Sequence, residues 1–211
     1  MKRAIFFDLD GTLWNALDPI MSAWNHAMEK ANLPYRFNLE KIQSFMGLTP
    51  EETCPLAFPD ADRKKGLSYF HLALVEEIKE LSIHPGTLYP HEKEVLAELA
   101  KQYPLYIVSN CDKGYIEDYL EACGTSSYFK GHVCVGDTGL GKADNILYLK
   151  QKENIDEVIY LGDTQKDQDE AKKAGVFFLH AAYGFGVISP DENKIDSFRE
   201  LPLAIRRHWV D

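Results

Sequence analysis

The sequence has no long hydrophobic run and few cysteines. No apolar stretch approaches the roughly 20 residues of a membrane-spanning helix, and the first residues form an apolar strand pattern rather than a signal peptide. The 4 cysteines show neither a Cys-x-x-Cys pair nor the spacing of a disulfide framework, so we expect reduced thiols. Together these absences favour a cytoplasmic protein without a membrane partner.

Positive charge is also scarce. The chain carries 23 Lys and Arg against 33 Asp and Glu, a net charge of -10 that repels polyanions at long range. Nucleic acid is therefore a poor candidate partner, and a small phosphorylated metabolite would need a local positive pocket. With 211 residues and 45% hydrophobic content, the chain can bury a large apolar core.

The chain opens on an apolar run at residues 4–7, which is followed by Asp8, Asp10 and Gly11. The run is typical of a strand buried on both faces. Side chains two apart point the same way, so both carboxylates would project beyond the strand's carboxyl end, where open α/β sheets bind ligands. With Mg²⁺ on Asp8, that carboxylate stays ionised and can attack phosphorus, while Asp10 can protonate a leaving oxygen. An acidic Asp-Gly turn is the alternative reading.

From residue 15 to residue 85 the pattern is helical. Apolar residues recur at helical spacing over 16–31 and again over 67–81. Between them, Asn38 and Thr49 are suited to cap two shorter helices. We therefore predict an all-helical domain at 15–85, inserted after the first strand of a core made of residues 1–14 and 86–211.

The rest of the chain alternates short strands with amphipathic helices, which predicts an α/β fold with a Rossmann-like parallel sheet. The opening strand joins this sheet, and a closing helix is expected over 197–207 with an interruption at Pro202. The predicted strands are 105–108, 132–135, 157–161 and 176–179, and the predicted helices are 90–101, 113–122, 143–152 and 166–174.

Polar residues follow three further strand or loop ends. Ser109 and Asn110 precede a helix whose N-terminus can bind an anion, although Asn110 could merely cap that helix. Lys142 ends a Gly-rich loop and could neutralise a phosphate, or be a solvated surface lysine. Asp163 and Asp167 could reach the same cation as Asp8, or could cap and line the first turn of a helix.

Taken in order along the chain, these groups of residues resemble the four motifs of the haloacid dehalogenase superfamily. The helical insert after the first motif is similar to the cap of its phosphoglycolate phosphatase-like branch. The matching residues are Asp8-Leu9-Asp10-Gly11-Thr12, Ser109, Lys142 and Gly162-Asp163…Asp167.

The resemblance implies a role for each residue. Asp8 would be the nucleophile and a metal ligand, and Asp10 the general acid and base that also offers its backbone carbonyl to Mg²⁺. Asp163 would ligate the metal with support from Asp167. The residues implied in phosphate binding are Thr12, Ser109, Asn110 and Lys142. By the same resemblance, Trp14 and the turn at 45–49 are candidates for substrate contacts from the insert, although core packing explains them equally well.

The function that this implies is a Mg²⁺-dependent phosphatase acting through an aspartyl-phosphate. A phosphomutase of the β-phosphoglucomutase type and a non-catalytic phosphate-binding regulator are the alternatives. Dehalogenase and phosphonatase chemistry are disfavoured because relatives with those activities lack the second aspartate, which is present here as Asp10. The physiological ester and the oligomeric state are left open.

Overall fold

The computed structural model describes residues 1–189 and 193–209, so positions 190–192 and 210–211 of the predicted core lie outside the described residues. The main sheet is parallel, with the spatial order β5-β4-β1-β6-β7-β8, which confirms the predicted α/β class. The strands are β1 (Arg3–Phe7), β4 (Leu105–Ser109), β5 (Phe129–Cys134), β6 (Glu157–Gly162), β7 (Phe177–Ala181) and β8 (Lys194–Ile195).

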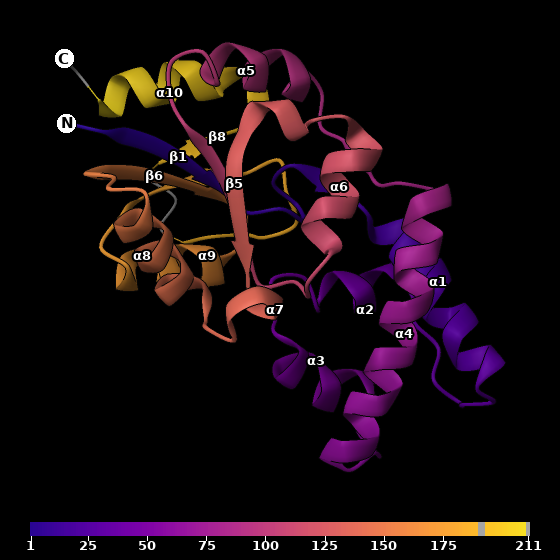
Figure 1. Ribbon diagram of the computed structural model, residues 1–211. Coiled ribbons are helices and arrows are strands. Elements are labelled where there is room, and N and C mark those ends of the chain that lie inside the picture. The colour runs from indigo at the N-terminus through magenta and orange to yellow at the C-terminus, as the bar shows by residue number, and fades with distance from the viewer. Residues whose placement is uncertain (190–192, 210–211) are drawn as a thin grey trace.

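Strand β1 lies inside the sheet and is buried on both faces, as its apolar run predicts. Ala4 and Phe6 pack with side chains of α8 (Lys142–Lys152) and α9 (Gln165–Lys173). Ile5 and Phe7 belong to a larger cluster on the other face. That face is covered by α5 (Glu92–Leu99), α6 (Tyr115–Cys123) and α10 (Leu201–His208). The helices therefore form a layer on each side of the sheet (Figure 1).

Four helices occupy the segment between the first strand and the rest of the sheet, and they lie to one side of it (Figure 1). As expected, Asn38 caps one helix and Thr49 begins another with a capping box. Trp24 packs against an aromatic group of the insert that includes Phe37 and Phe58. The four helices are α1 (Leu17–Lys30), α2 (Leu39–Gln43), α3 (Pro50–Ala57) and α4 (Arg63–Ile83).

The two connections to these helices lie side by side. Strand β2 (Trp14–Asn15) pairs antiparallel with β3 (Thr87–Leu88), a ribbon too short to leave a periodic sequence signal. Gly86 fits beside it because it has no side chain: a Cβ there would come within 2.6 Å of the Trp14 ring. The β2–β3 pairing therefore joins the two chain segments that connect the core to the insert.

Three predicted boundaries differ from the structure. The strand expected at 132–135 is β5, which begins at Phe129, and the next residues form the short helix α7 (Val135–Thr138) within the loop expected to be irregular. Pro202 does not interrupt the closing helix but lies in its first turn, where the missing N–H has no helical partner to lose. Strand β8 was not predicted, since its two residues give no pattern.

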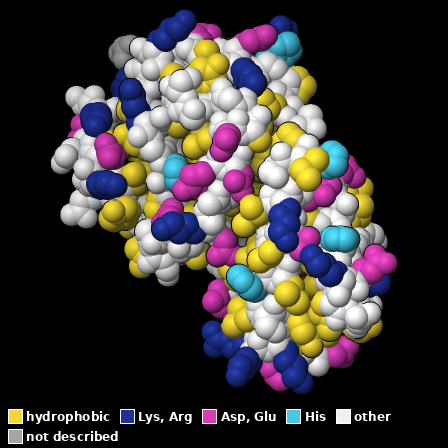
Figure 2. All heavy atoms as spheres, turned by 45° about the vertical axis from the view of Figure 1, so that its right-hand side comes forward, with side chains coloured by type: hydrophobic (Ala, Val, Ile, Leu, Met, Phe, Trp, Pro, Cys, Tyr) yellow, Lys and Arg dark blue, Asp and Glu magenta, His cyan; other side chains and the backbone are white. Residues whose placement is uncertain are grey.

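The molecular surface carries no broad basic patch on the face shown in Figure 2, where Lys and Arg are scattered among acidic side chains. Among the described helices, none combines the length and apolar character needed to cross a membrane.

Candidate active site

Asp8 follows β1 directly and is buried beside Lys142, the first residue of α8. The Lys142 ammonium donates to Asp8 Oδ1 at 2.8 Å and to Asp167 Oδ1 at 2.5 Å. Lys142 is only 1% exposed. The lysine predicted from the Gly-rich loop is therefore a buried bridge between two carboxylates rather than a solvated surface group.

Asp163 and Asp167 lie where β6 passes into α9. Asp167 closes a capping box with Thr164, whose hydroxyl donates to Asp167 Oδ2 at 2.6 Å. Asp163 Oδ2 accepts the Phe185 backbone N–H at 2.7 Å. The hydroxyl of Thr12 is buried and donates to Asp163 Oδ1 at 3.4 Å, so in this conformation it faces the acidic cluster.

The electrostatics of this cluster are dominated by burial. Burial raises the pKa of Asp8 to about 7, the Asp167 charge adds to the rise and the Lys142 ammonium opposes it. Burial, with the charges of Asp167 and Asp8, also holds the pKa of Asp163 well above its usual range. Burial alone would raise the pKa of Asp167 too, but Lys142 and the hydrogen bonds from Thr164 outweigh it and lower that pKa. The cluster therefore has an excess of acidic groups, three carboxyls to one ammonium, whose charged forms burial disfavours.

This excess fits a divalent cation. One carboxylate oxygen from each of Asp8, Asp163 and Asp167 can be chosen so that all three lie within 4.8 Å of one another. Hard cations such as Mg²⁺ prefer oxygen ligands of this kind. The Asp10 carboxylate is not part of this group, and the predicted contribution of its backbone carbonyl stays a prediction.

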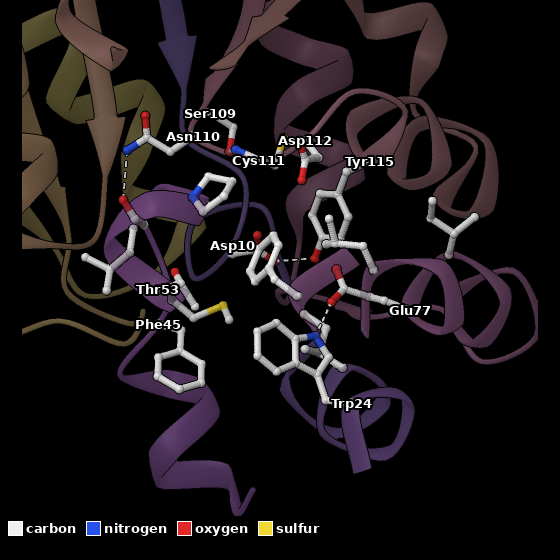
Figure 3. A pocket seen from close by; sticks show the side chains of 18 of the residues that line it. Asp10, Trp24, Phe45, Thr53, Glu77, Ser109, Asn110, Cys111, Asp112 and Tyr115 are labelled. Atoms are coloured by element: carbon white, nitrogen blue, oxygen red, sulfur yellow. Dashed lines mark hydrogen bonds between the residues drawn. The ribbon is translucent and has the colours of Figure 1, made fainter. Parts of the chain in front are cut away.

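Asp10 lines the cavity, and Figure 3 shows it hydrogen-bonded to Tyr115. Its Oδ1 accepts hydrogen bonds from Tyr115 Oη at 2.8 Å and from Trp14 Nε1 at 3.0 Å. Burial raises the pKa of Asp10 to about 6, although both of these hydrogen bonds act to lower it. The two neighbouring aspartates thus have separate surroundings, one facing the acidic cluster and the other held by aromatic donors.

Ser109 ends β4 and Asn110 follows it, and both are buried at the cavity. Ser109 Oγ accepts the Cys111 backbone N–H at 3.3 Å. The Asn110 amide donates to the Gly47 carbonyl at 2.8 Å, across to the helical insert, while its Oδ1 is buried without a partner among the described residues. Asn110 therefore connects the sheet edge to the insert in addition to lying where a phosphoryl group is expected.

The cavity itself lies between the sheet edge and the insert and has a volume of about 320 Å³. Asp8, Asp10, Ser109 and Asn110 line one side of it. The predicted turn at 45–49 lines the other side through residues 45–48, whereas Trp14 is fully buried beneath Asp10 and does not line it. Thr12, Lys142, Asp163 and Asp167 lie behind the lining.

Comparison with known proteins identifies the family of this chain. The family model for the haloacid dehalogenase-like hydrolases matches residues 5–181. The chain belongs to this family. The family predicted from the four motifs is therefore confirmed, and the hydrolase shares its fold with solved members.

Curated relatives cover most of this hydrolase. A phosphoglycolate phosphatase from Photorhabdus laumondii is 29% identical over 87% of this chain and 81% of its own length. A phosphoglycolate phosphatase from Vibrio parahaemolyticus is 27% identical over 87% and 85%. A probable phosphatase named IndB from Dickeya dadantii is 28% identical over 95% and 92%.

Solved structures agree in fold at lower sequence identity. A haloacid dehalogenase-like hydrolase from Streptococcus pneumoniae superimposes with a TM-score of 0.84 over 97% of this chain and 98% of that one, at 24% identity. The CbbY protein from Rhodobacter sphaeroides superimposes with a TM-score of 0.81 over 95% and 96%, at 17% identity. At these identities the likeness shows the fold alone.

Three residues at the site of this hydrolase were not found from the sequence. Tyr115 binds Asp10, and Tyr160 donates to the Val108 carbonyl at 3.0 Å, close behind Lys142. Both are aromatic residues in apolar patterns and give no signal of their own. Glu77 did give a sequence signal. It is an acidic residue three positions after Leu74, so it lies within the apolar stripe of α4 and not on the face that is expected to meet solvent.

Proposed function

We propose that this hydrolase is a Mg²⁺-dependent phosphatase that cleaves a small phosphomonoester through an aspartyl-phosphate on Asp8. The observation that carries the proposal is the buried Lys142 bridge, which holds Asp8 at 2.8 Å beside a cavity that Asp10 also lines. The relatives named phosphatases support this reaction class.

In the first step, an Asp8 carboxylate oxygen attacks phosphorus and the bond from phosphorus to the ester oxygen breaks. Asp10 gives its proton to the departing alcohol oxygen, which suits a carboxyl whose pKa burial raises to about 6. Lys142 offsets the negative charge at the reacting centre. Ser109 and Asn110 bind the phosphoryl oxygens, Ser109 through its hydroxyl hydrogen and Asn110 through the amide N–H that does not bond to Gly47.

In the second step, Asp10, now ionised, takes a proton from water, and the water oxygen attacks phosphorus. The bond from phosphorus to Asp8 breaks, which releases inorganic phosphate and restores both carboxyl groups. Tyr115 and Trp14 position Asp10 for both proton transfers through their hydrogen bonds to its Oδ1.

The metal would be held by Asp8 and Asp163, with the Asp10 backbone carbonyl as a further ligand and Asp167 in support. When bound, Mg²⁺ supplies positive charge that neutralises the phosphoryl oxygens. Asp167 acts through Lys142, whose ammonium it binds at 2.5 Å. Thr12 remains a predicted phosphate-binding residue, although its hydroxyl is bonded to Asp163 in this conformation.

We further propose that residues 15–85 act as a cap on the core formed by 1–14 and 86–211. The β2–β3 ribbon carries both crossings, and the Asn110–Gly47 hydrogen bond joins cap and core across the cavity. A cap of this kind excludes water and selects the substrate, here a small phosphorylated metabolite.

The test is phosphate release from phosphoglycolate, pyrophosphate, nucleoside monophosphates, sugar phosphates and p-nitrophenyl phosphate, with Mg²⁺ or with chelator. We expect release that needs Mg²⁺ and is lost in Asp8→Asn. Absence of release from every compound, with folding verified by circular dichroism, would overturn the proposal.

A further inference from the structure

The insert side of the cavity is strongly apolar. Its lining comes from α1, the 45–48 turn, α3 and α4, which bring mostly aliphatic and aromatic side chains over the catalytic edge. The apolar residues that α4 contributes are Phe70, Leu74, Val75 and Ile78. An alcohol with an apolar body would bury its surface here without losing hydrogen bonds to water.

Among the described insert residues that line the cavity, Glu77 is the one carboxyl group, and Thr53 and His71 are the other polar side chains. Glu77 lines the cavity but is only 6% exposed, and Trp24 Nε1 donates to its Oε2 at 2.6 Å. The described residues provide no hydrogen bond to its other oxygen, Oε1. Figure 3 shows Glu77 on the same side of the cavity as Trp24, opposite Ser109 and Asn110, with Asp10 and Tyr115 between. Glu77 therefore offers a fixed acceptor at a distance from the phosphoryl site.

The charge around the cavity disfavours a second anion. Besides Asp8, the described lining residues include the acids Asp10, Glu77 and Asp112, the basic residues His71 and Lys113, and no arginine. His71 and Lys113 are both exposed, so water screens them. A carboxylate on the leaving alcohol would be desolvated against apolar side chains, and no buried basic side chain of the described lining would offset its charge.

We propose, building on the phosphatase function above, that the substrate is a phosphate ester of an uncharged or cationic alcohol. Its apolar chain packs on α4 and ends in a hydroxyl or ammonium group that donates to Glu77 Oε1. This class differs from the carboxylate-bearing ester named for several relatives.

The surroundings of Glu77 leave its Oε1 atom able to accept a hydrogen bond from a substrate. Burial raises the pKa of Glu77 to about 8, the Trp24 hydrogen bond opposes this, and the charges of Asp10, Asp112 and Asp118 add to it. A hydroxyl or ammonium group at Oε1 would supply the hydrogen bond that water gives an exposed carboxylate.

The test uses four esters of similar length: propyl, hydroxypropyl, aminopropyl and carboxyethyl phosphate. We expect kcat/KM for the better of the hydroxypropyl and aminopropyl esters to exceed that for the carboxyethyl ester by about tenfold or more. The ranking of those two tells a hydroxyl substrate from a cationic one. A carboxyethyl ester hydrolysed as well as the others would overturn the proposal while leaving the phosphatase function intact.

Glu77→Gln tests the residue itself. The amide oxygen can still accept from Trp24, but an amide cannot ionise beside an ammonium group as a carboxyl can, so the aminopropyl-to-propyl ratio of kcat/KM should fall. Glu80→Gln on the same helix is the matched control, since Glu80 bonds His84 and does not line the cavity. A ratio that is unchanged in Glu77→Gln and equal to that of the control would contradict the assignment of Glu77.

A binding measurement tests the proposed substrate class independently of the proposed phosphatase reaction. Calorimetric titration of the same four esters into Asp8→Asn protein ranks them without turnover. If no ester is hydrolysed by the wild type, the phosphatase proposal fails, and the binding order still decides the substrate class. Equal or tighter binding of the carboxyethyl ester would overturn it.

Discussion

At the sheet edge charged side chains pair with one another, whereas the described insert residues that line the cavity are mostly apolar and include the buried carboxyl of Glu77. Lys142 of α8 is held by partners from two other parts of the edge, since it reaches both Asp8 after β1 and Asp167 of α9. Glu77 has one donor from one neighbouring helix. The proposed reaction therefore depends on the sheet edge, and the proposed selection of the substrate depends on the insert.

Because of this difference, we expect substitutions at the sheet edge and substitutions in the insert lining to impair the protein in different ways. A change at the edge alters charge balance in a cluster shielded from water, where uncompensated carboxylates are costly. A change among the insert residues that line the cavity alters the shape of the cavity or a single hydrogen bond, and it leaves the reacting groups in place. The predictions below test this contrast.

Asp8→Asn should have the largest effect. The amide oxygen is a poor nucleophile, so we expect phosphate release to fall by at least about a thousandfold. The measurement is steady-state phosphate release with saturating Mg²⁺. Asp144→Asn on the exposed surface of α8 is the control and should keep wild-type activity. Substantial turnover by Asp8→Asn would remove Asp8 as the nucleophile.

Lys142→Met should be the most destabilising of these changes. It removes the cation between Asp8 and Asp167, which leaves buried carboxylates unpaired and lowers the free energy of unfolding by about 3–5 kcal/mol in metal-free buffer. Mg²⁺ should recover part of this loss because it binds only the folded cluster. Urea unfolding with and without Mg²⁺ measures both effects.

Lys173→Met is the matched control for that experiment. Lys173 also pairs with a carboxylate, Glu170, but its side chain is 64% exposed. Its loss should therefore change the free energy of unfolding by less than about 1 kcal/mol. Equal losses in the two variants would mean that the sheet-edge cluster is no more sensitive to charge than the surface.

The sheet edge could be predicted from the sequence because each of its residues follows a strand or a loop with a clear pattern. Asp8, Ser109 and Asp163 lie at strand ends, and parallel strands bring their carboxyl ends together. The insert could be predicted only as helices. Which of its side chains face the cavity depends on how α1 and α4 pack, and helical spacing alone does not give that.

The hydrogen-bond partners of the predicted site residues could not be predicted from the sequence either. The Tyr115 hydroxyl reaches Asp10 from a helix that begins 105 residues later, and nothing local marks a tyrosine in an apolar stripe as a donor. The same holds for Asn110, whose amide binds the insert backbone at Gly47. Long-range hydrogen bonds of this kind are fixed by tertiary packing rather than by local pattern.

Glu77→Gln should change how stability depends on pH. Burial raises the pKa of Glu77 from 4.5 to about 8 in the folded chain. Between these values the folded state keeps a proton that the unfolded state releases, so Glu77 lowers stability increasingly as pH rises through this window. The advantage of Glu77→Gln over wild type should therefore grow from pH 5 to pH 8, by up to about 1.4 kcal/mol per pH unit, and then level off.

Urea unfolding of both proteins at several pH values measures that difference, and Glu92 serves as an internal reference because it is unchanged in both. Its pKa is also raised to about 8, mainly by burial, so it contributes equally to the two curves. A difference between the proteins that does not vary with pH would show that Glu77 does not keep a proton in the folded state.

Tyr115→Phe should have the smallest effect, and it separates positioning from packing. The variant removes one of the two donors to Asp10 but keeps the ring, so we expect hydrolysis of an alkyl phosphate to slow by roughly tenfold. Hydrolysis of p-nitrophenyl phosphate should slow less, because its leaving group departs without a proton. Tyr119→Phe on the same helix is the matched control: its hydroxyl is bonded to Glu92 and its ring also packs on Trp14. If both variants slow both substrates alike, Tyr115 supports the fold near Asp10 and does not position its proton.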